Sequence, residues 1–256
     1  MKEKIATALW FAQRPNFWEH GFALAKRKFL SDYDTPELSA RANAWAADRV
    51  VPVETALKAI GIDGQPPTLN PAVLQAAKEH ANKAIKMGGP GDLDLLYAAV
   101  YLTNAASVVE TGVAYGWSSL AILAAMADSG CAHTKQLISV DMPYPKMGNE
   151  AFVGIVVPDN LRRNWVLIRE PDRRGLEKAL ACLKAPLDFC HYDSDKSWRG
   201  RKYAYPLLWG ALKSGGIFIS DDIQDNMAFA EFVEEEKVPF AVTGYEGKFI
   251  GICRKP

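Results

Sequence analysis

Three carboxylates directly follow apolar segments in the second half of the chain. Asp193 comes just after residues 187–192, and Asp221 and Asp222 come just after residues 216–220. If these segments are neighbouring parallel strands, the three acids converge at one edge of a sheet, where like charges are costly unless a cation or a proton relieves them. Oxygen ligands of this kind suit a hard cation such as Mg²⁺. The alternative is that each acid caps the helix that follows it.

A glycine-containing turn precedes these acids at residues 110–119, Glu-Thr-Gly-Val-Ala-Tyr-Gly-Trp-Ser-Ser. It follows an apolar segment and opens a helical one, so its glycines allow close approach of a ligand and its helix N-terminus offers free N–H groups. The G-x-x-x-G spacing does not fit the dinucleotide fingerprint G-x-G-x-x-G, and the turn lacks the lysine of a P-loop. These departures disfavour a dehydrogenase, and Glu110 suits a positively charged ligand better than a pyrophosphate. The alternative is a plain turn from strand to helix.

Asp141 comes directly after another apolar segment, residues 136–140. A carboxylate at the end of a strand can accept hydrogen bonds from the hydroxyl groups of a ribose. Asp is common after strands, so Asp141 alone is weak evidence for a ribose site. The evidence is stronger because this segment follows the glycine turn. Together the two features indicate a ligand with a nucleoside part.

Short apolar segments alternate with helical ones from residue 92 onward. The strands are expected at 107–110, 136–140, 165–168, 187–192 and 216–220, and the helices at 92–104, 118–128, 174–183 and 203–212. This alternation predicts an α/β fold, a Rossmann-like doubly wound parallel sheet with helices on both faces in three α/β/α layers. Residues 240–243 and 248–252 face each other across a turn, which predicts a C-terminal hairpin and one antiparallel strand.

The first ninety residues differ in composition from the rest. They are rich in Ala, Lys, Glu and Trp, and their patterns predict helices, for example over 39–59 and 72–87. The run Gly88-Gly89-Pro90-Gly91 breaks regular structure. We therefore expect a helical cap or substrate-lid region over residues 1–90 and a core domain over residues 91–256.

An aromatic cluster lies near the N-terminus, at Trp10, Phe11, Phe17, Trp18 and Phe22. We expect it to pack the cap onto the core. A substrate lid and a dimer contact are the alternatives, and the second corresponds to an expected homodimer.

Composition narrows the class of protein further. The 30 Lys and Arg residues balance the 30 Asp and Glu residues, which disfavours a protein that binds nucleic acid by neutralising phosphates. We find no signal peptide and no apolar run of the roughly 20 residues that cross a bilayer, so we expect a soluble, cytoplasmic protein without a membrane partner. The four cysteines form no C-x-x-C pair, which predicts reduced thiols rather than a zinc site.

These features together resemble the class I S-adenosylmethionine-dependent methyltransferases. The turn at 110–119 resembles the first motif of that family, Asp141 its ribose-binding acid, and the C-terminal hairpin its reversed strand. The resemblance covers roughly residues 92–253. Within the family, residues 192–198, Tyr-Asp-Ser-Asp-Lys-Ser-Trp, are similar to the D-G-x-H-S-Y segment of family 24. The pair Asp221-Asp222 resembles the acids of metal-dependent sugar O-methyltransferases of the macrocin type.

The resemblance implies S-adenosylmethionine as cofactor, with Glu110 and Gly112 at its methionine part and Asp141 at its ribose. The full set expected to bind the cofactor is Glu110, Thr111, Gly112, Tyr115, Gly116, Ser118, Asp141 and Asp193. The implied Mg²⁺ ligands are Asp193, Asp221 and Asp222. Residues 170–172 correspond to the usual adenine contact.

The catalytic residues that the resemblance implies are Asp195, Lys196 and Asp193. Asp195 matches the position of a general base in the sugar enzymes. Lys196 replaces the usual His and Ser194 the usual Gly, so the base stays open between Asp195 and Lys196.

The expected function is O-methylation of a small hydroxylated molecule, such as a sugar, a polyketide or a catechol-like compound, assisted by Mg²⁺. A vicinal diol is the natural substrate, because its two hydroxyls would chelate the metal. One alternative is an N-methyltransferase or another chemistry on the same fold without a metal. A further alternative is a non-catalytic protein that binds S-adenosylmethionine or serves in assembly.

Overall fold

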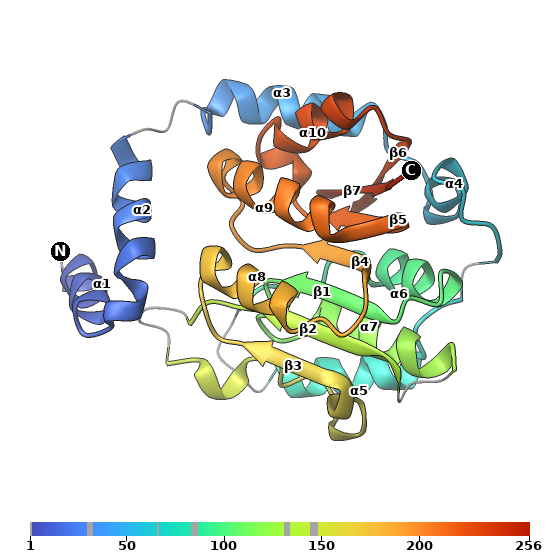
Figure 1. Ribbon diagram of the computed structural model, residues 1–256, viewed down its shortest axis with the longest axis horizontal. Helices are drawn as coiled ribbons and strands as arrows, with labels where there is room; N and C mark the ends of the chain where they lie inside the picture. Colours follow the sequence, from blue (N-terminus) through green and yellow to red (C-terminus); the bar gives the residue numbers. More distant parts are fainter. Residues whose placement is uncertain (1, 30–32, 66, 83–86, 131–133, 144–147) are drawn as a thin grey trace.

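The computed structural model describes residues 2–29, 33–65, 67–82, 87–130, 134–143 and 148–256 (Figure 1). Its centre is a seven-stranded sheet in the order β3-β2-β1-β4-β5-β7-β6. The strands are β1 Ser107–Thr111, β2 Gln136–Val140, β3 Trp165–Ile168, β4 Leu187–Tyr192, β5 Leu212–Ser220, β6 Phe240–Tyr245 and β7 Lys248–Arg254. Strands β1 to β5 pair in parallel, and β7 runs antiparallel to both β5 and β6. The predicted doubly wound sheet with a C-terminal hairpin is therefore confirmed.

The helices cover both faces of this sheet. They are α1 Lys2–Ala12, α2 Trp18–Phe29, α3 Pro36–Ala47, α4 Val53–Ala59, α5 Pro71–Ala81, α6 Leu93–Leu102, α7 Trp117–Asp128, α8 Asp172–Ala181, α9 Trp198–Ala211 and α10 Ala228–Glu236. Short 3₁₀ turns lie at η1 Pro15–Phe17, η3 Glu150–Phe152, η4 Asp159–Asn164 and η5 Ile223–Asp225. The elements form three layers, helix on sheet on helix.

Alternate residues of the strands point into two separate apolar cores. Val108 packs with α4, α6 and α7 on one face of the sheet. Val109 packs with α8, α9 and α10 on the other face, where Ala46 of α3 also lies. Because both faces are covered, the strands are apolar along their whole length.

Two helices begin earlier than the sequence predicts. Helix α9 begins at Trp198 rather than at 203, because the Ser197 side chain caps it by accepting a hydrogen bond from the Gly200 N–H. Helix α8 begins at Asp172, directly after Pro171. Both corrections extend a helix towards the sheet edge that carries the predicted acids.

The N-terminal helices α1 and α2 stand beside the sheet in Figure 1, at the edge to which β3 and β4 point. Trp10 packs edge-on against Phe11 and Phe17, so this part of the aromatic cluster is local to α1 and η1. Trp18 and Phe22 are 49% and 73% exposed, so these two rings do not pack on the core.

The strand register brings the predicted site residues into one row. Thr111 at the end of β1 pairs with Val140 of β2 and with Tyr192 of β4. Tyr192 in turn pairs with Ser220 of β5. The residues that follow these strand ends, Gly112, Asp141, Asp193 and Asp221, therefore lie side by side at the carboxyl edge of the sheet.

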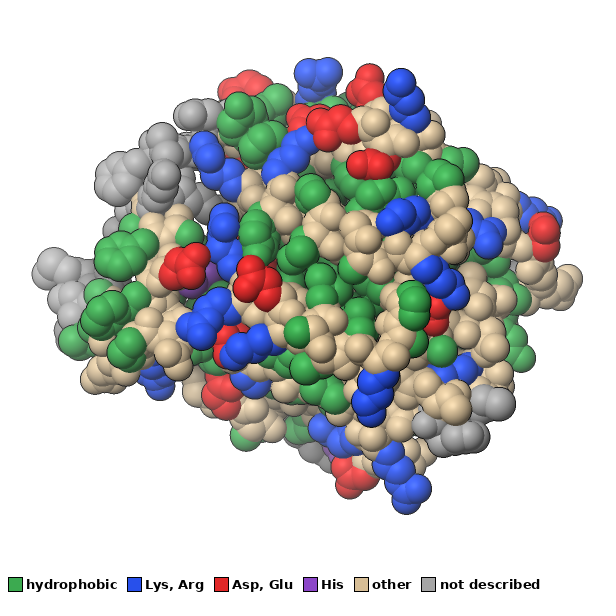
Figure 2. Space-filling model, in the orientation of Figure 1, with side chains coloured by type: hydrophobic (Ala, Val, Ile, Leu, Met, Phe, Trp, Pro, Cys, Tyr) green, Lys and Arg blue, Asp and Glu red, His purple; other side chains and the backbone are tan. Residues whose placement is uncertain are grey.

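The described residues contain no helix that is long and apolar enough to cross a membrane. On the face shown in Figure 2, Lys and Arg side chains lie interspersed with Asp and Glu. This mixture agrees with the zero net charge of the sequence.

Substitution of Phe218 measures how much the core behind the site contributes to the free energy of unfolding. It is fully buried in β5 and packs against Tyr205, Trp209 and Phe232. We expect Phe218→Ala to lower the free energy of unfolding by roughly 3–5 kcal/mol, because a large cavity would remain. Urea unfolding measures this. Val166→Ala on the edge strand β3, where the side chain is 38% exposed, is the control and should cost below about 1 kcal/mol. Equal losses in the two variants would contradict this account.

Candidate active site

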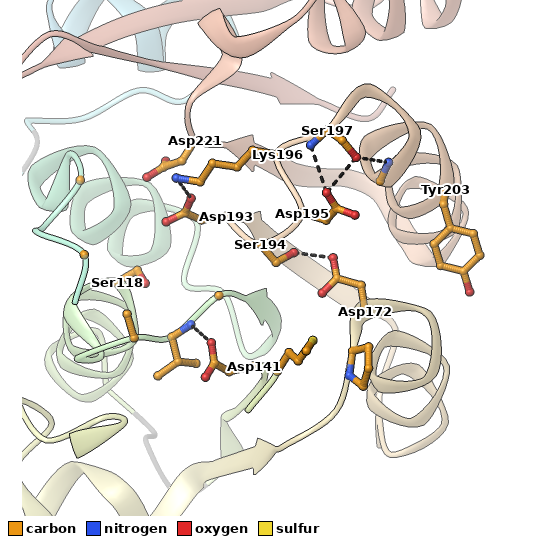
Figure 3. A pocket seen from close by; sticks show the side chains of 18 of the residues that line it. Ser118, Asp141, Asp172, Asp193, Ser194, Asp195, Lys196, Ser197, Tyr203 and Asp221 are labelled. Atoms are coloured by element: carbon orange, nitrogen blue, oxygen red, sulfur yellow. Dashed lines mark hydrogen bonds and ion pairs between the residues drawn. The ribbon is translucent and has the colours of Figure 1, made fainter. Parts of the chain in front are cut away.

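A cavity of about 650 Å³ opens at the carboxyl edge of the sheet (Figure 3). Its size suits a cofactor together with a small acceptor. Seven of the residues predicted for the site line it: Gly112, Ser118, Asp141, Asp193, Asp195, Lys196 and Asp221. His20, Ala23 and Leu24 of α2 form part of the wall, so the N-terminal region contributes to this cavity.

Gly112 lets the ends of β1 and β4 approach each other closely. Its φ is +79°, in the region that favours glycine, and a Cβ there would collide with the carbonyl oxygen of Asp193. Gly116, with φ +92°, then turns the chain into α7. The two glycines therefore let this turn pack closely against the chain around it, and residues 112–114 of the turn, which we call the cradle, line the cavity.

Asp141 is 4% exposed and is held in place by two partners. Its Oδ1 accepts a hydrogen bond from the Val113 N–H at 3.0 Å, and its Oδ2 pairs with the Arg169 guanidinium. Burial raises the pKa of Asp141, while the Val113 N–H and Arg169 oppose this effect. A carboxylate fixed in this way at the cavity wall can accept hydrogen bonds from ribose hydroxyls.

Glu110 lies behind the cavity wall rather than in it. It is fully buried, and its Oε2 accepts hydrogen bonds from the hydroxyls of Ser119 at 2.5 Å and Ser139 at 2.6 Å. Its Oε1 lies 3.7 Å from Nδ1 of His191. Glu110 thus joins β1, β2, β4 and α7, and direct contact with a cofactor stays a prediction.

Three other residues predicted to bind the cofactor support the cavity from outside its lining. The Thr111 hydroxyl accepts hydrogen bonds from the Asp193 N–H at 3.2 Å and the Ser194 hydroxyl at 2.9 Å. The Tyr115 hydroxyl accepts one from the Met87 N–H at 3.2 Å. Gly116 acts through its backbone turn.

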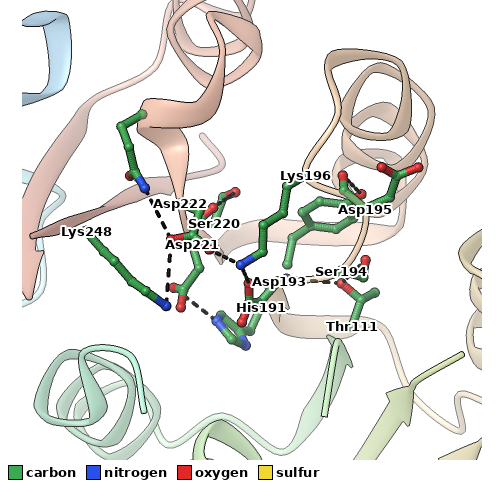
Figure 4. A network of polar contacts seen from close by, with 12 residues as sticks. Thr111, His191, Asp193, Ser194, Asp195, Lys196, Ser220, Asp221, Asp222 and Lys248 are labelled. Carbon is green, nitrogen blue, oxygen red and sulfur yellow. Dashed lines mark hydrogen bonds and ion pairs between the residues drawn. The ribbon is translucent and has the colours of Figure 1, made fainter. Parts of the chain in front are cut away.

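Lys196 lies between two of the predicted metal ligands (Figure 4). Its Nζ is 3.2 Å from Oδ1 of Asp193 and makes a shorter contact with Oδ2 of Asp222. Lys248 approaches Asp222 from β7 at 3.8 Å. Burial lowers the pKa of Lys196, but the two carboxylates outweigh this and raise it above its usual value. Lys196 is therefore protonated in this arrangement.

Asp221, the third predicted ligand, faces a buried histidine. Nε2 of His191 lies 3.3 Å from Oδ1 of Asp221. Burial lowers the pKa of His191, yet Asp221 and Glu110 together raise it to about 10. The imidazolium thus balances two carboxylates that would otherwise be buried as uncompensated charges.

The acid cluster fits a cation by its charge and by its oxygen donors. The Lys196 ammonium stands in that position between Asp193 and Asp222, while Asp221 points to His191. Across the part of the chain that the structure describes, no three His, Cys, Asp or Glu side chains are grouped around a common metal position. A divalent ion would therefore need Lys196 and Asp221 to turn. The magnesium site stays a prediction.

The two candidate bases lie in different surroundings. Lys196 contacts the acid cluster. Asp195 instead accepts hydrogen bonds through Oδ1 from the Ser197 N–H at 3.1 Å and the Ser197 hydroxyl at 2.8 Å. Asp195 thus shapes the start of α9, although it also lines the cavity.

Asp172, in the segment predicted to contact adenine, lines the cavity too. Its Oδ2 accepts hydrogen bonds from the Ser194 hydroxyl at 2.5 Å and the Tyr192 hydroxyl at 3.3 Å. Burial raises its pKa to about 6, against the effect of the Ser194 hydrogen bond.

Several residues around the site escaped the sequence reasoning. Arg169 holds Asp141, and the fully buried Arg201 and Asn226 hold the loops of the acid cluster. His191 is buried in β4 and also contacts Asp221. No motif marks these positions, because their partners come from distant strands.

The pKa of Asp172 makes a testable contribution to stability. Its folded value of about 6 exceeds the unfolded value of about 3.9, so this contribution is present at low pH and is lost as pH rises through about 4 to 6. Between these pH values we expect Asp172 to cost the wild type about 1–2 kcal/mol of unfolding free energy, and Asp172→Asn should not show this loss. The amount is reduced because part of the side chain faces the open cavity. Urea unfolding of both proteins at pH 4.5 and 7 measures the difference. Parallel pH profiles would contradict the assignment.

Comparison with known proteins agrees with this geometry. Residues 109–223 match the family model of a methyltransferase domain, family 24. No curated protein matches the chain. The chain resembles the crystal structure of an O-methyltransferase from Bacillus cereus in complex with SAH, with 16% identity, a TM-score of 0.56 and coverage of 86% of this chain and 99% of that one.

Two further solved structures share the fold. The O-methyltransferase TomG from Streptomyces achromogenes, in complex with SAM, has 14% identity and a TM-score of 0.53, over 80% of this chain and 96% of that one. The SAH-bound Podospora anserina methyltransferase PaMTH1 has 13% identity and a TM-score of 0.54, over 87% and 97%. Residues 109–223 thus match a methyltransferase domain, and the whole chain shares the fold of these methyltransferase structures.

Proposed function

We propose that this enzyme transfers the methyl group of S-adenosylmethionine to a hydroxyl oxygen of a small molecule that carries a vicinal diol, with help from Mg²⁺. One observation supports this most. The glycine cradle at Gly112 and the acid cluster around Lys196 border the same cavity. A cofactor held at the cradle and an acceptor held at the acids would therefore lie next to each other.

The cradle and Asp141 are suited to hold the cofactor. Gly112 lines the cavity, and Asp141 presents a fixed carboxylate for the ribose. S-adenosylmethionine supplies a methyl group already activated by the positive sulfonium. The chain must then exclude water and align the acceptor oxygen with that methyl group.

The acid cluster is suited to hold the acceptor. Asp193, Asp221 and Asp222 would bind the divalent ion, which would lower the pKa of the acceptor hydroxyl and orient it. Lys196 keeps its proton while it is paired with Asp193 and Asp222. It becomes a base only when the acceptor or the ion separates it from these carboxylates, because its pKa then falls.

The position of Lys196 supports a second candidate, methyl transfer without a metal to oxygen or nitrogen. Its ammonium already neutralises Asp193 and Asp222. In this case the lysine would orient the acceptor by hydrogen bonding and the carboxylates would take the proton. The two candidates differ in their response to Mg²⁺ and to a chelator.

Asp222→Asn distinguishes them. We expect Mg²⁺ to raise turnover of catechol and sugar diols by the wild type, EDTA to abolish the increase, and the variant to lose it. The reason is that the variant lacks a charged oxygen ligand. Calorimetry should show that the affinity for S-adenosylmethionine is unchanged within about threefold, because Asp222 is not one of the residues that line the cavity.

Asp225→Asn is the matched control, because Asp225 is a partly buried acid on the same turn and is not one of the proposed metal ligands. It should respond to Mg²⁺ like the wild type. Turnover that is indifferent to Mg²⁺ and EDTA would remove the metal and favour the second candidate. Absence of S-adenosylmethionine binding would remove both.

Gly112→Ala tests the cradle. The added methyl would collide with the Asp193 carbonyl and would strain a backbone at φ +79°, so we expect affinity for S-adenosylmethionine to fall by at least about tenfold. Gly130→Ala is the control: Gly130 has φ +83°, and an added Cβ would meet open space. Calorimetry on both variants separates the collision from backbone strain. Equal affinities in the two variants would contradict the assignment of the cradle.

A further inference from the structure

The guanidinium of Arg201 is fully buried and donates hydrogen bonds mainly to main-chain oxygens. Its Nη2 donates to the carbonyl of Asp222 at 2.7 Å and to that of Asp221 at 3.2 Å, and its Nη1 donates to Oδ1 of Asn226 at 3.4 Å. The nearby Asp225 carboxylate feels its charge, which acts to lower the pKa of Asp225, but among the described residues Arg201 forms no ion pair within 4.0 Å. Burying a guanidinium is costly, so its hydrogen bonds to the acid-bearing turn must matter to that turn.

Asn226 continues these contacts to the lysine-bearing loop. Its Nδ2 donates to the carbonyl of Lys196 at 2.9 Å and to Oδ1 of Asp34 at 3.0 Å. Its Oδ1 also accepts from the Ala228 N–H at 3.2 Å. A chain of side-chain hydrogen bonds therefore joins the backbone of Lys196 to the backbone of Asp222.

The two loops joined in this way need such a constraint. Lys196 follows β4 and Asp222 follows β5, so the contact between their side chains depends on how the two loops sit. Asp222 also has φ +51° and ψ +40°, a left-handed conformation that few residues other than Gly, Asn and Asp adopt. Such a conformation persists where surrounding contacts hold it.

The N-terminal segment is attached to the same point. Oδ1 of Asp34 accepts from the Trp198 N–H at 2.8 Å as well as from Asn226. The ring of Tyr33 stacks on Trp198 with centroids 4.0 Å apart. The segment that follows α2 is thereby linked to the start of α9, directly after Lys196.

We propose that Arg201 and Asn226 are positioning residues that hold the Lys196 ammonium against the Asp222 carboxylate. Neither residue lines the cavity, so they act on the reaction only through Lys196 and Asp222. The consequence for catalysis rests on the proposed function. The positioning does not depend on the proposed function, because the chemical reactivity of Lys196 measures it directly.

The reactivity of Lys196 reports its position. Its side chain is 42% exposed, so a small amine-acylating reagent can reach it, while its contacts with Asp193 and Asp222 hold the nitrogen against the carboxylates and slow acylation. We expect acetic anhydride to label Lys196 about fivefold faster in Asn226→Ala and Arg201→Met than in the wild type, the factor expected from losing one hydrogen bond. Mass spectrometry quantifies labelling against Lys202, which pairs with Glu231 and Glu235. Asp222→Asn shows the effect of removing the partner itself.

Lys255→Met is the matched control. Lys255 also donates to two main-chain carbonyls, those of Trp209 and Leu212, but at the other end of α9. This variant should leave labelling of Lys196 and turnover at the wild-type level. If Arg201 acted only by stabilising the fold, Lys255→Met would change labelling and turnover in the same way as Arg201→Met.

Turnover gives the second readout. For an acceptor that the wild type methylates, Asn226→Ala should lower kcat about tenfold, while affinity for S-adenosylmethionine stays within about threefold. If Arg201→Met does not fold, Asn226→Ala decides. Wild-type labelling rates in a folded Asn226→Ala protein would overturn the proposal. A wild type that methylates no acceptor would overturn the proposed function, and the labelling would still test the positioning.

Discussion

The site depends above all on the compensation of buried negative charge at one edge of the sheet. The parallel strands end in register, and each is followed by an acid or a glycine. Carboxylates gathered in this way repel each other and lose solvation. In this fold each carboxylate lies next to a cationic side chain. Arg169 pairs with Asp141, His191 with Asp221, and Lys196 with Asp193 and Asp222.

This compensation gives the cavity two ends with different properties. At the cradle, glycine and a fixed carboxylate offer a backbone surface and hydrogen-bond acceptors. At the acid cluster, the Lys196 ammonium lies between the carboxylates of Asp193 and Asp222. The first end thus presents backbone and a carboxylate held by Arg169, and the second presents a lysine paired with two carboxylates.

The support for this arrangement lies outside the cavity. Glu110 anchors β1 to β2 and α7 through two serine hydroxyls, and Arg201 anchors the turn after β5. Both are fully buried. Side chains in such positions have few alternative conformations, so the groups in front of them keep their places.

The sequence by itself determined the order of strands and helices, the reversed strand and the row of acids. These follow from local apolar patterns and from the rule that parallel strands end at the same edge. They are confirmed by the sheet order and by the residues that line the cavity. The start of α9 was placed too late, because its cap at Ser197 lay inside a segment interpreted as a functional motif.

Only the tertiary structure decided which partner each acid takes. Asp221 pairs with His191 of the neighbouring strand, Lys196 contacts Asp222 from another loop, and Glu110 turns away from the cavity. These contacts join residues far apart in the sequence, and each depends on register, on burial and on the direction of a side chain. Local pattern sets which groups reach the edge of the sheet, whereas packing between elements sets how their charges are balanced.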